Sequence, residues 1–464
     1  MGQKISQLTD GVTAVGSDLL RVARSSGGGY IDRRLSVQDI LDQTNQTIQN
    51  ITITGGDTLR IKDFEDGVNT SGTGVARSLA SLGYTNGTAA TQFPLTAARW
   101  GSIDASTVDY DTAVIQEAFE TLRNGSNKIR KLEAGFGYFT LAGNEIIVPS
   151  YKSTGNGGTY DPQQFIFDGC GSMFRMSGSQ AYGFTMSIAD QTEALGDCID
   201  NRWTFGNLAM RGTGINTGIR LGATRSAFVH NINVVNFNVG IQVGFLLNAL
   251  YQNVSTTSCD TIGFLVDKGW WTGAGYSTAG NQPYFLNCRF RTTDVDQYGA
   301  KVVGADSTVF ERCTVEGTDG LYGIYIDNSS SSVSKNAIVR GLHSELGNGN
   351  KYTNAIIGVK GADPYTFVIS EVYSQGAAGV VLVESESVNA TNTVVIRNCK
   401  AVSTQFKLNQ INSGGVTHWD IANTNLPGGP STNADVIDTI NYPNIWATAT
   451  VPTLSRVKFS PALT

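Results

Sequence analysis

Two glutamates, Glu316 and Glu345, occupy equivalent positions in a repeated phrase of this sequence. If the repeats stack as neighbouring strands, their carboxyl groups lie about 5 Å apart, close to the spacing of the acid and nucleophile in retaining glycosidases. Like charges at this distance disfavour joint ionisation, so one carboxyl group keeps its proton and acts as the acid. Asp319, in the loop that follows Glu316, is a third candidate catalytic carboxylate.

The same counting predicts four substrate-binding side chains on the outward face: Arg289, Arg291, His343 and Tyr373. Arg291 is suited to bind an acidic sugar or to hold Glu316 ionised, and His343 or Tyr373 to serve a lyase as base. A solvated Arg–Glu ladder without function is the competing interpretation, because such exposed pairs contribute little. A register slip of one residue turns all of these side chains to the opposite face. Two further carboxylates, Glu384 and Glu386, show no partner by spacing.

Trp270 and Trp271 stand in the longest insertion between two copies of the phrase, from residue 254 to 286. Sugars stack on aromatic faces, so one interpretation is a saccharide platform. The other is a plug in a subunit interface, where buried tryptophans are also common. The sequence leaves both interpretations open.

The elements that position these residues come from a repeat that runs from about residue 203 to 421. Its phrase is an apolar residue, any residue, a marker residue that is most often Asn, and an apolar residue. The markers are Asn207, Asn231, Asn253, Asn287, Arg312, Gly341, Glu371 and Asn398. A second phrase begins at Gly218, Gly240, Gly263, Gly299, Gly323 and Gly379. Steps of 22 to 34 residues between markers indicate a solenoid.

Both phrases are short and rich in β-branched or aromatic residues, which predicts strands. Phe285 and Cys288 are both expected inside, although strict alternation would put them on opposite faces. Asn287 therefore stands at a corner, since Asn tolerates the left-handed backbone conformation. Two or three short strands per coil, stacked in parallel, make a parallel β-helix. The alternative, a sandwich or propeller, would show hairpin turns.

Composition excludes several other classes. The net charge of −6 argues against nucleic acid as the main partner. The sequence contains no run of 18 apolar residues, so we do not expect a membrane span. Its start lacks the apolar segment of a secretion signal. Cys288, Cys313 and Cys399 share one inward position and are expected to be buried hydrophobes, not metal or redox groups. With three His and no phosphate loop or nucleophile elbow, we expect no metal and no cofactor.

The N-terminal segment contains Ile5-Ser-Gln-Leu8, Asp18-Leu-Leu, the glycines at 27–29 and a predicted helix after Ser36. This order resembles the N-terminal motif of bacteriophage tailspike and tail-fibre proteins. The resemblance implies a strand, a glycine turn, a strand and a helix that attach the protein to phage tail or adaptor proteins. The apolar residues between 37 and 51 suggest a trimeric coiled neck or a single amphipathic helix.

Residues 104–150 resemble the opening of pectate-lyase-like β-helix proteins, phage tailspikes among them. Asp104, Asp111, Gln116 and Ala118 match that pattern, and Ile146-Ile-Val-Pro149 follows. The usual Gly-Asp-Gly is replaced by Ile103-Asp-Ala, so the resemblance bears on fold more than on chemistry. It implies a right-handed parallel β-helix, a homotrimer and a location in the virion tail.

We therefore expect an all-β chain in four parts. They are an attachment domain and neck (1–74), a solenoid entry with a capping helix after Asp111 (75–150), the β-helix (151–424) and a proline-rich C-terminal cap or trimerisation tail (425–464). Three functions remain open. The first is a tailspike that binds host-surface polysaccharide, the second is a spike that also cleaves it as a glycosidase or lyase, and the third is a cellular polysaccharide-degrading enzyme.

Overall fold

The computed structural model describes part of the chain, and the structural statements below concern that part. The described residues are 19–26, 29–36, 58–60, 77–78, 94–95, 112, 115, 131–134, 138–143, 145–149, 164–187, 202–267, 280–329, 335–347, 352–362, 364–375, 380–388, 391–402, 406–413, 416–422 and 424. The chain divides into two compact units, the second of which comprises 58–66, 103–123 and 129–464.

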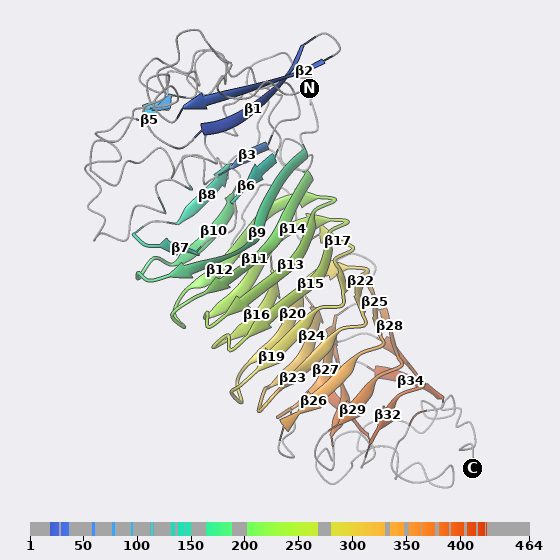
Figure 1. Ribbon diagram of the computed structural model, residues 1–464. Coiled ribbons are helices and arrows are strands. Elements are labelled where there is room, and N and C mark those ends of the chain that lie inside the picture. The colour runs from blue at the N-terminus through green and yellow to red at the C-terminus, as the bar shows by residue number, and fades with distance from the viewer. Residues whose placement is uncertain are drawn as a thin grey trace, which may run out of the picture. The chain divides into compact units, whose positions relative to one another are not determined.

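The first unit contains an antiparallel hairpin of β1 (Leu19–Ser26) and β2 (Gly29–Ser36), drawn in dark blue in Figure 1. Ser26 pairs with Gly29 at the end of the hairpin, and residues 27 and 28 between them lie outside the described residues. A short antiparallel pair follows, β4 (Arg77–Ser78) with β5 (Pro94–Leu95). The predicted helix after Ser36 and the neck between 37 and 51 lie outside the described residues.

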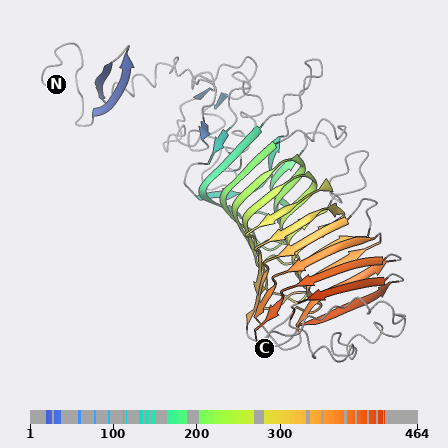
Figure 2. The same ribbon diagram turned by 90° about the vertical axis from the view of Figure 1, so that its right-hand side faces the viewer.

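The second unit is built of parallel strands in stacked sheets, which Figures 1 and 2 show in chain order from green to red. One sheet, here called row three, contains β8 (Ile146–Pro149), β10 (Tyr182–Ser187), β12 (Thr217–Arg225), β14 (Val239–Leu247), β16 (Ile262–Val266), β20 (Tyr298–Val303), β24 (Tyr322–Asn328), β27 (Ala355–Gly361), β30 (Val381–Val388) and β33 (Lys407–Ser413). Two short strands, β17 (Gly280–Asn281) and β21 (Ala305–Asp306), extend it at one side.

The opposing sheet bends at the marker residues. Its first coils use β3 (Thr58–Arg60), β6 (Lys131–Glu133), β7 (Tyr138–Leu141) and the long strands β9 (Gln164–Met176), β11 (Arg202–Arg211), β13 (Phe228–Val235) and β15 (Leu250–Thr257). Later coils have separate strands on the two sides of the bend. Row one, before the marker, contains β18 (Tyr284–Leu286), β22 (Thr308–Glu311), β25 (Lys335–Arg340), β28 (Tyr365–Ser370), β31 (Thr391–Arg397) and β34 (Val416–Ala422). Row two, after it, contains β19 (Arg289–Thr292), β23 (Thr314–Gly317), β26 (His343–Leu346), β29 (Tyr373–Gln375) and β32 (Lys400–Ala401).

The marker residues are corners, as predicted. All eight have left-handed backbone conformation, with φ between 51° at Asn231 and 67° at Gly341. The coil that contains Asn231 has two more such positions, Ser226 (52°) and Asn236 (63°), so this coil turns at three places. Asn, Ser and Gly enter this conformation more readily than bulky residues.

Amide side chains link the first corners into a ladder. The Nδ2 of Asn231 donates to Oδ1 of Asn207 (2.9 Å), and the Nδ2 of Asn253 donates to Oδ1 of Asn231 (3.0 Å). Asn207 in turn donates to Oδ1 of Asp168 (3.0 Å), so a carboxylate ends the ladder. These three Asn residues thus both accommodate the turn and hold adjacent coils in register.

Replacing Asn231 by alanine is expected to lower the free energy of unfolding by about 2 kcal/mol, because it removes exposed hydrogen bonds and forces a Cβ-bearing residue without a polar side chain into left-handed conformation. Asn231→Gly loses the same hydrogen bonds without that backbone cost and should lose about 1 kcal/mol. Urea unfolding of both variants measures the difference. Equal losses would show that the corner conformation contributes nothing.

The core lies between row three and the opposing sheet. Phe285 in row one stacks on Tyr251 (5.0 Å between ring centroids) and Phe310 (4.3 Å) of adjacent coils, and meets Phe264 of row three edge-on (5.0 Å). Phe285 and Cys288 are both buried, which confirms the predicted inward pair. Aromatic rings in register from coil to coil therefore fill the interior.

Of the segment in which a capping helix was predicted, the structure describes two residues. Thr112 and Ile115, just after Asp111, are helical and buried. The backbone N–H of Ala142 donates to Oγ1 of Thr112 (2.9 Å), which joins this segment to the end of β7.

The described part of the chain is thus nearly all β, with long parallel strands in stacked sheets, and is compatible with a parallel β-helix. Strand pairs of the second unit run parallel at each described coil, whereas a sandwich of hairpins would show antiparallel neighbours. Residues 425–464, predicted as a cap or trimerisation tail, lie outside the described residues.

Candidate functional site: the outward face of row two

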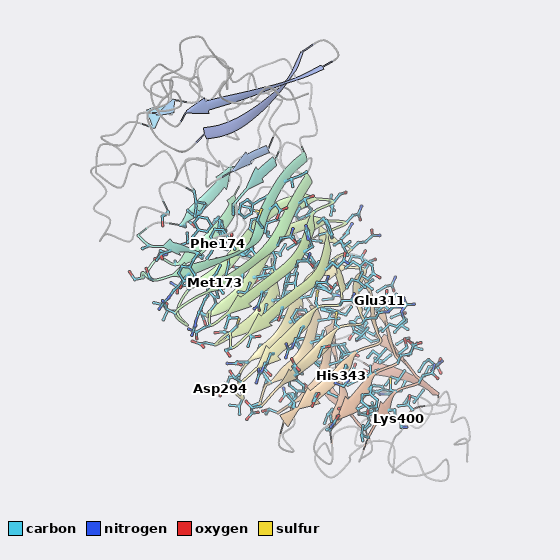
Figure 3. All side chains as sticks on the ribbon, in the orientation of Figure 1. Met173, Phe174, Asp294, Glu311, His343 and Lys400 are labelled. Carbon is cyan, nitrogen blue, oxygen red and sulfur yellow. The ribbon has the colours of Figure 1, made fainter. Side chains whose placement is uncertain are left out.

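The predicted site residues fall into two outward columns of row two. The first column contains Arg289, Thr314, His343, Tyr373 and Lys400, and the second contains Arg291, Glu316, Glu345 and Gln375. Glu316 and Glu345 are paired residues of adjacent strands, at the register that the repeat predicted. Figure 3 labels His343 and Lys400 on this row, and Glu311 on row one. We call the two columns together the row-two face.

Each of the two glutamates has a cationic partner. The carboxylate of Glu316 forms an ion pair with Nε of Arg289, one coil away. Arg291, for which the sequence suggested either this role or the binding of an acidic sugar, is directly in register with Glu316, but the ion pair is formed by Arg289. The carboxylate of Glu345 lies 3.3 Å from Nε2 of His343 on the same strand.

Aromatic and cationic groups complete this face. The rings of His343 and Tyr373 are stacked, with centroids 5.5 Å apart and planes 14° from parallel. Tyr373 is 41 % exposed, so this aromatic pair is accessible to solvent. The side chains of Arg291 and Lys400 have no ion-pair or hydrogen-bond partner among the described residues, and both are exposed. The row-two face therefore offers two uncommitted cations beside an aromatic pair.

The remaining predicted residues do not join this group. Asp319 lies in the loop after β23, where its Oδ1 accepts the backbone N–H of Gly320 (3.0 Å). Trp270 and Trp271 lie outside the described residues. Lys400 was not predicted, although it stands two residues after the marker Asn398 and the counting rule that gave Arg289 and His343 applies to it.

A second polar cluster lies on the outward side of row three. The Tyr322 hydroxyl donates to Glu384, which is 5 % exposed, and Nδ2 of Asn354 donates to that hydroxyl (2.7 Å). Glu386 forms an ion pair with Lys360 (3.1 Å) in the adjacent strand. Spacing in the sequence had shown no partner for Glu384 or Glu386, and the structure gives each of them one. Burial raises the pKa of Tyr322, and its hydrogen bond to Glu384 raises that pKa further.

This row-three cluster is closed, unlike the row-two face. The ammonium group of Lys301 lies over the ring of Tyr298 (4.8 Å) and near that of Tyr325 (5.8 Å), so the chain's own cation already occupies the aromatic surface. A Cβ at Gly358 would lie 2.5 Å from the ring of Tyr325 and 2.6 Å from the ring of Tyr322, so this glycine makes room for both rings. We therefore assign the candidate binding surface to row two.

Among the residues that the structure describes, no group of three or more His, Cys, Asp or Glu side chains is arranged to hold a metal ion. Within the same part of the chain, no helix is both long and apolar enough to cross a membrane. No family model, curated protein or solved structure matches this chain.

Buried tyrosines make the fold sensitive to alkaline pH. Burial raises the pKa of Tyr251 and of Tyr352 above the ordinary value near 10. Their contribution to stability is complete below pH 10, where the unfolded chain is also protonated, and is lost as the pH rises above 10. The expected loss is about 1.4 kcal/mol per tyrosine for each pH unit. Urea unfolding at pH 8 to 11 measures it.

Tyr251→Phe is the informative variant for this prediction. The Tyr251 hydroxyl is buried and has no hydrogen-bond partner among the described residues, so its removal should leave the free energy of unfolding at pH 8 unchanged or higher. The same variant should lose less stability than the wild type above pH 10. An identical alkaline decline in both proteins would contradict the assignment.

Proposed function

We propose that this protein is a tailspike or tail fibre of a bacteriophage virion that binds a host-surface polysaccharide along the row-two face. The observation that carries the proposal is the register of that face, in which the His343–Tyr373 stack and Lys400 stand in line along one column and Arg291 lies in the adjacent column. A linear polymer of sugars suits a linear array of donors and acceptors. The mixed signs of charge suit hydroxyl-rich chains better than the phosphates of nucleic acid.

The proposed architecture is a right-handed parallel β-helix with a virion-attachment domain at 1–74 and a cap or trimerisation tail at 425–464. The general preference of parallel connections for right-handed crossovers supports the winding sense. The tail-fibre-like start of the sequence supports attachment to phage tail or adaptor proteins, assembly as a homotrimer and location in the virion tail.

Binding to a panel of purified bacterial capsules and O-antigens, both neutral and acidic, tests the proposal. Arg291→Ala and Tyr373→Ala should each weaken binding of the recognised polysaccharide by about 10-fold or more, the effect of one lost hydrogen bond to a charged or aromatic anchor. Arg340→Ala, the same change at an exposed site on row one, is the matched control and should bind as the wild type does. Equal weakening by Arg340→Ala, or no binding to any polymer, would contradict the proposal.

Cleavage of the same polysaccharide is the second candidate function, because Glu316 and Glu345 are in register on adjacent strands. Release of oligosaccharides on incubation with the recognised polymer would establish it. Loss of that release in both Glu316→Gln and Glu345→Gln, with binding retained, would assign the acid pair. Because Arg289 already pairs with the Glu316 carboxylate, we expect binding without release.

A further inference from the structure

A continuous apolar stripe runs along the outward side of row one and its preceding coils. Its members are Phe228, Leu250, Tyr284, Val309, Ile338, Val368 and Val395, each in register with the next. None of them is buried, and Ile338 is 39 % exposed. Outward columns of row two are polar at the corresponding coils, so the apolar character belongs to this column and not to the outer surface in general.

Polar residues flank the stripe on both sides. On one side Arg340 pairs with Glu311 (2.7 Å), and Arg397 pairs with Asp420 (2.5 Å), which follows Val395 in the column of the stripe itself and ends the apolar run. On the other side stand Asn336, Thr366 and Thr393, which are uncharged. An apolar centre with a polar rim is the usual composition of a protein–protein interface. The charged side chains beside the stripe are already paired within the chain, so this surface is not suited to a partner that binds mainly through charge.

The size of this surface fits a stable contact. Seven coils with three outward columns cover a strip about 30 Å long and about 20 Å wide, from the strand spacing and the rise per residue. The resulting area of about 600 Å² is near the roughly 800 Å² that each partner of a standard interface buries. The apolar side chains of the stripe recur once per coil, at the spacing between adjacent strands. A partner can contact all of them only if its own side chains recur at the same spacing.

We propose that the row-one stripe is the contact surface between copies of this chain, packed with their coil stacks parallel. A second copy has the same spacing by identity, so at each level an apolar residue meets an apolar residue. The proposal deepens the homo-oligomer proposed above by naming its contact surface, and it rests on that assembly but not on polysaccharide binding.

The test is the mass of the full chain in solution, measured by sedimentation velocity at micromolar concentrations. The wild type should be a multimer, and Ile338→Asp should self-associate at least about 30-fold more weakly, the effect of a charge placed at the centre of an interface. Ile215→Asp is the matched control, since Ile215 is 68 % exposed in a turn away from the stripe, and it should keep the wild-type mass. A monomeric wild type, or equal dissociation by both variants, would overturn the proposal.

Cysteine cross-linking covers the case in which Ile338→Asp fails to fold. Mild oxidation should join copies of Ile338→Cys into a covalent dimer, because equivalent residues meet near the axis between parallel stacks. Ile215→Cys and the wild type should stay uncross-linked. Cross-linking at residue 215 but not at residue 338 would place the contact elsewhere. Failure of polysaccharide binding would leave these masses unchanged, so the two proposals fail separately.

Discussion

Replacing Phe285 by alanine is expected to lower the free energy of unfolding by about 4 kcal/mol, the typical cost of truncating a fully buried phenylalanine. The ring is fully buried and has four aromatic neighbours, two in adjacent coils, one across the core in row three and Phe290 in its own coil. Its removal leaves a cavity that the coils above and below cannot fill, because their own spacing is set by strand hydrogen bonds.

Urea unfolding of Phe285→Ala measures this loss. Tyr138→Ala is the control, because Tyr138 is 59 % exposed at the start of β7 and should lose less than about 1 kcal/mol. A small effect at Phe285 would mean that the aromatic interior is not close-packed. A large effect at Tyr138 would mean that the surface is misassigned.

Gly240→Ala is the second change with a large expected effect, a loss of about 3 kcal/mol in the free energy of unfolding. A Cβ at Gly240 would lie 2.5 Å from the backbone oxygen of Gly263 in the next strand and 3.0 Å from Sγ of Cys259. The same close approach recurs at Gly218 and Gly263, where a Cβ would lie 2.6 Å and 2.5 Å from the next backbone oxygen. Since that oxygen belongs to the ladder between strands, it cannot move without breaking hydrogen bonds.

Gly347→Ala is the matched control for this prediction. The nearest atom to a Cβ at Gly347 is the backbone oxygen of Gly317 at 3.6 Å, an ordinary contact distance. Its free energy of unfolding should change by less than about 1 kcal/mol, and any gain would reflect the less flexible unfolded chain. Equal losses in the two variants would contradict the close packing of coils at Gly240.

Much of the structure of each coil was predictable, because it depends on residue types at single positions and on alternation along one strand. A corner needs one residue that tolerates positive φ, and the markers from Asn207 to Asn398 identified those residues by spacing alone. Alternation then placed Phe285 inside and Glu316 outside, since the period of a strand is two. The other corners of the coil, such as Ser226 and Asn236, were missed because they have no constant residue type.

Contacts that cross between coils were less predictable. Counting along strands gives residues in register, such as Arg291 with Glu316, but the ion pair of Glu316 is formed diagonally by Arg289. Tyr322 spans two strands, from β24 past β27 to Glu384 in β30. Such contacts depend on side-chain length and on a gap at Gly358, neither of which appears as a repeat in the sequence. The catalytic and binding roles assigned to the row-two residues stay predictions.

The most direct test of the account is disulfide mapping of the register at the row-two face. In a chain with Glu316→Cys and Glu345→Cys, oxidation should give an intramolecular disulfide, because paired residues of adjacent strands have Cα atoms about 5 Å apart. In a chain with Glu316→Cys and Ser344→Cys it should not, since Ser344 is buried and points to the opposite face. Mass spectrometry of the linked peptides reads the result, and a link through residue 344 but not residue 345 would contradict the winding and the proposed binding face together.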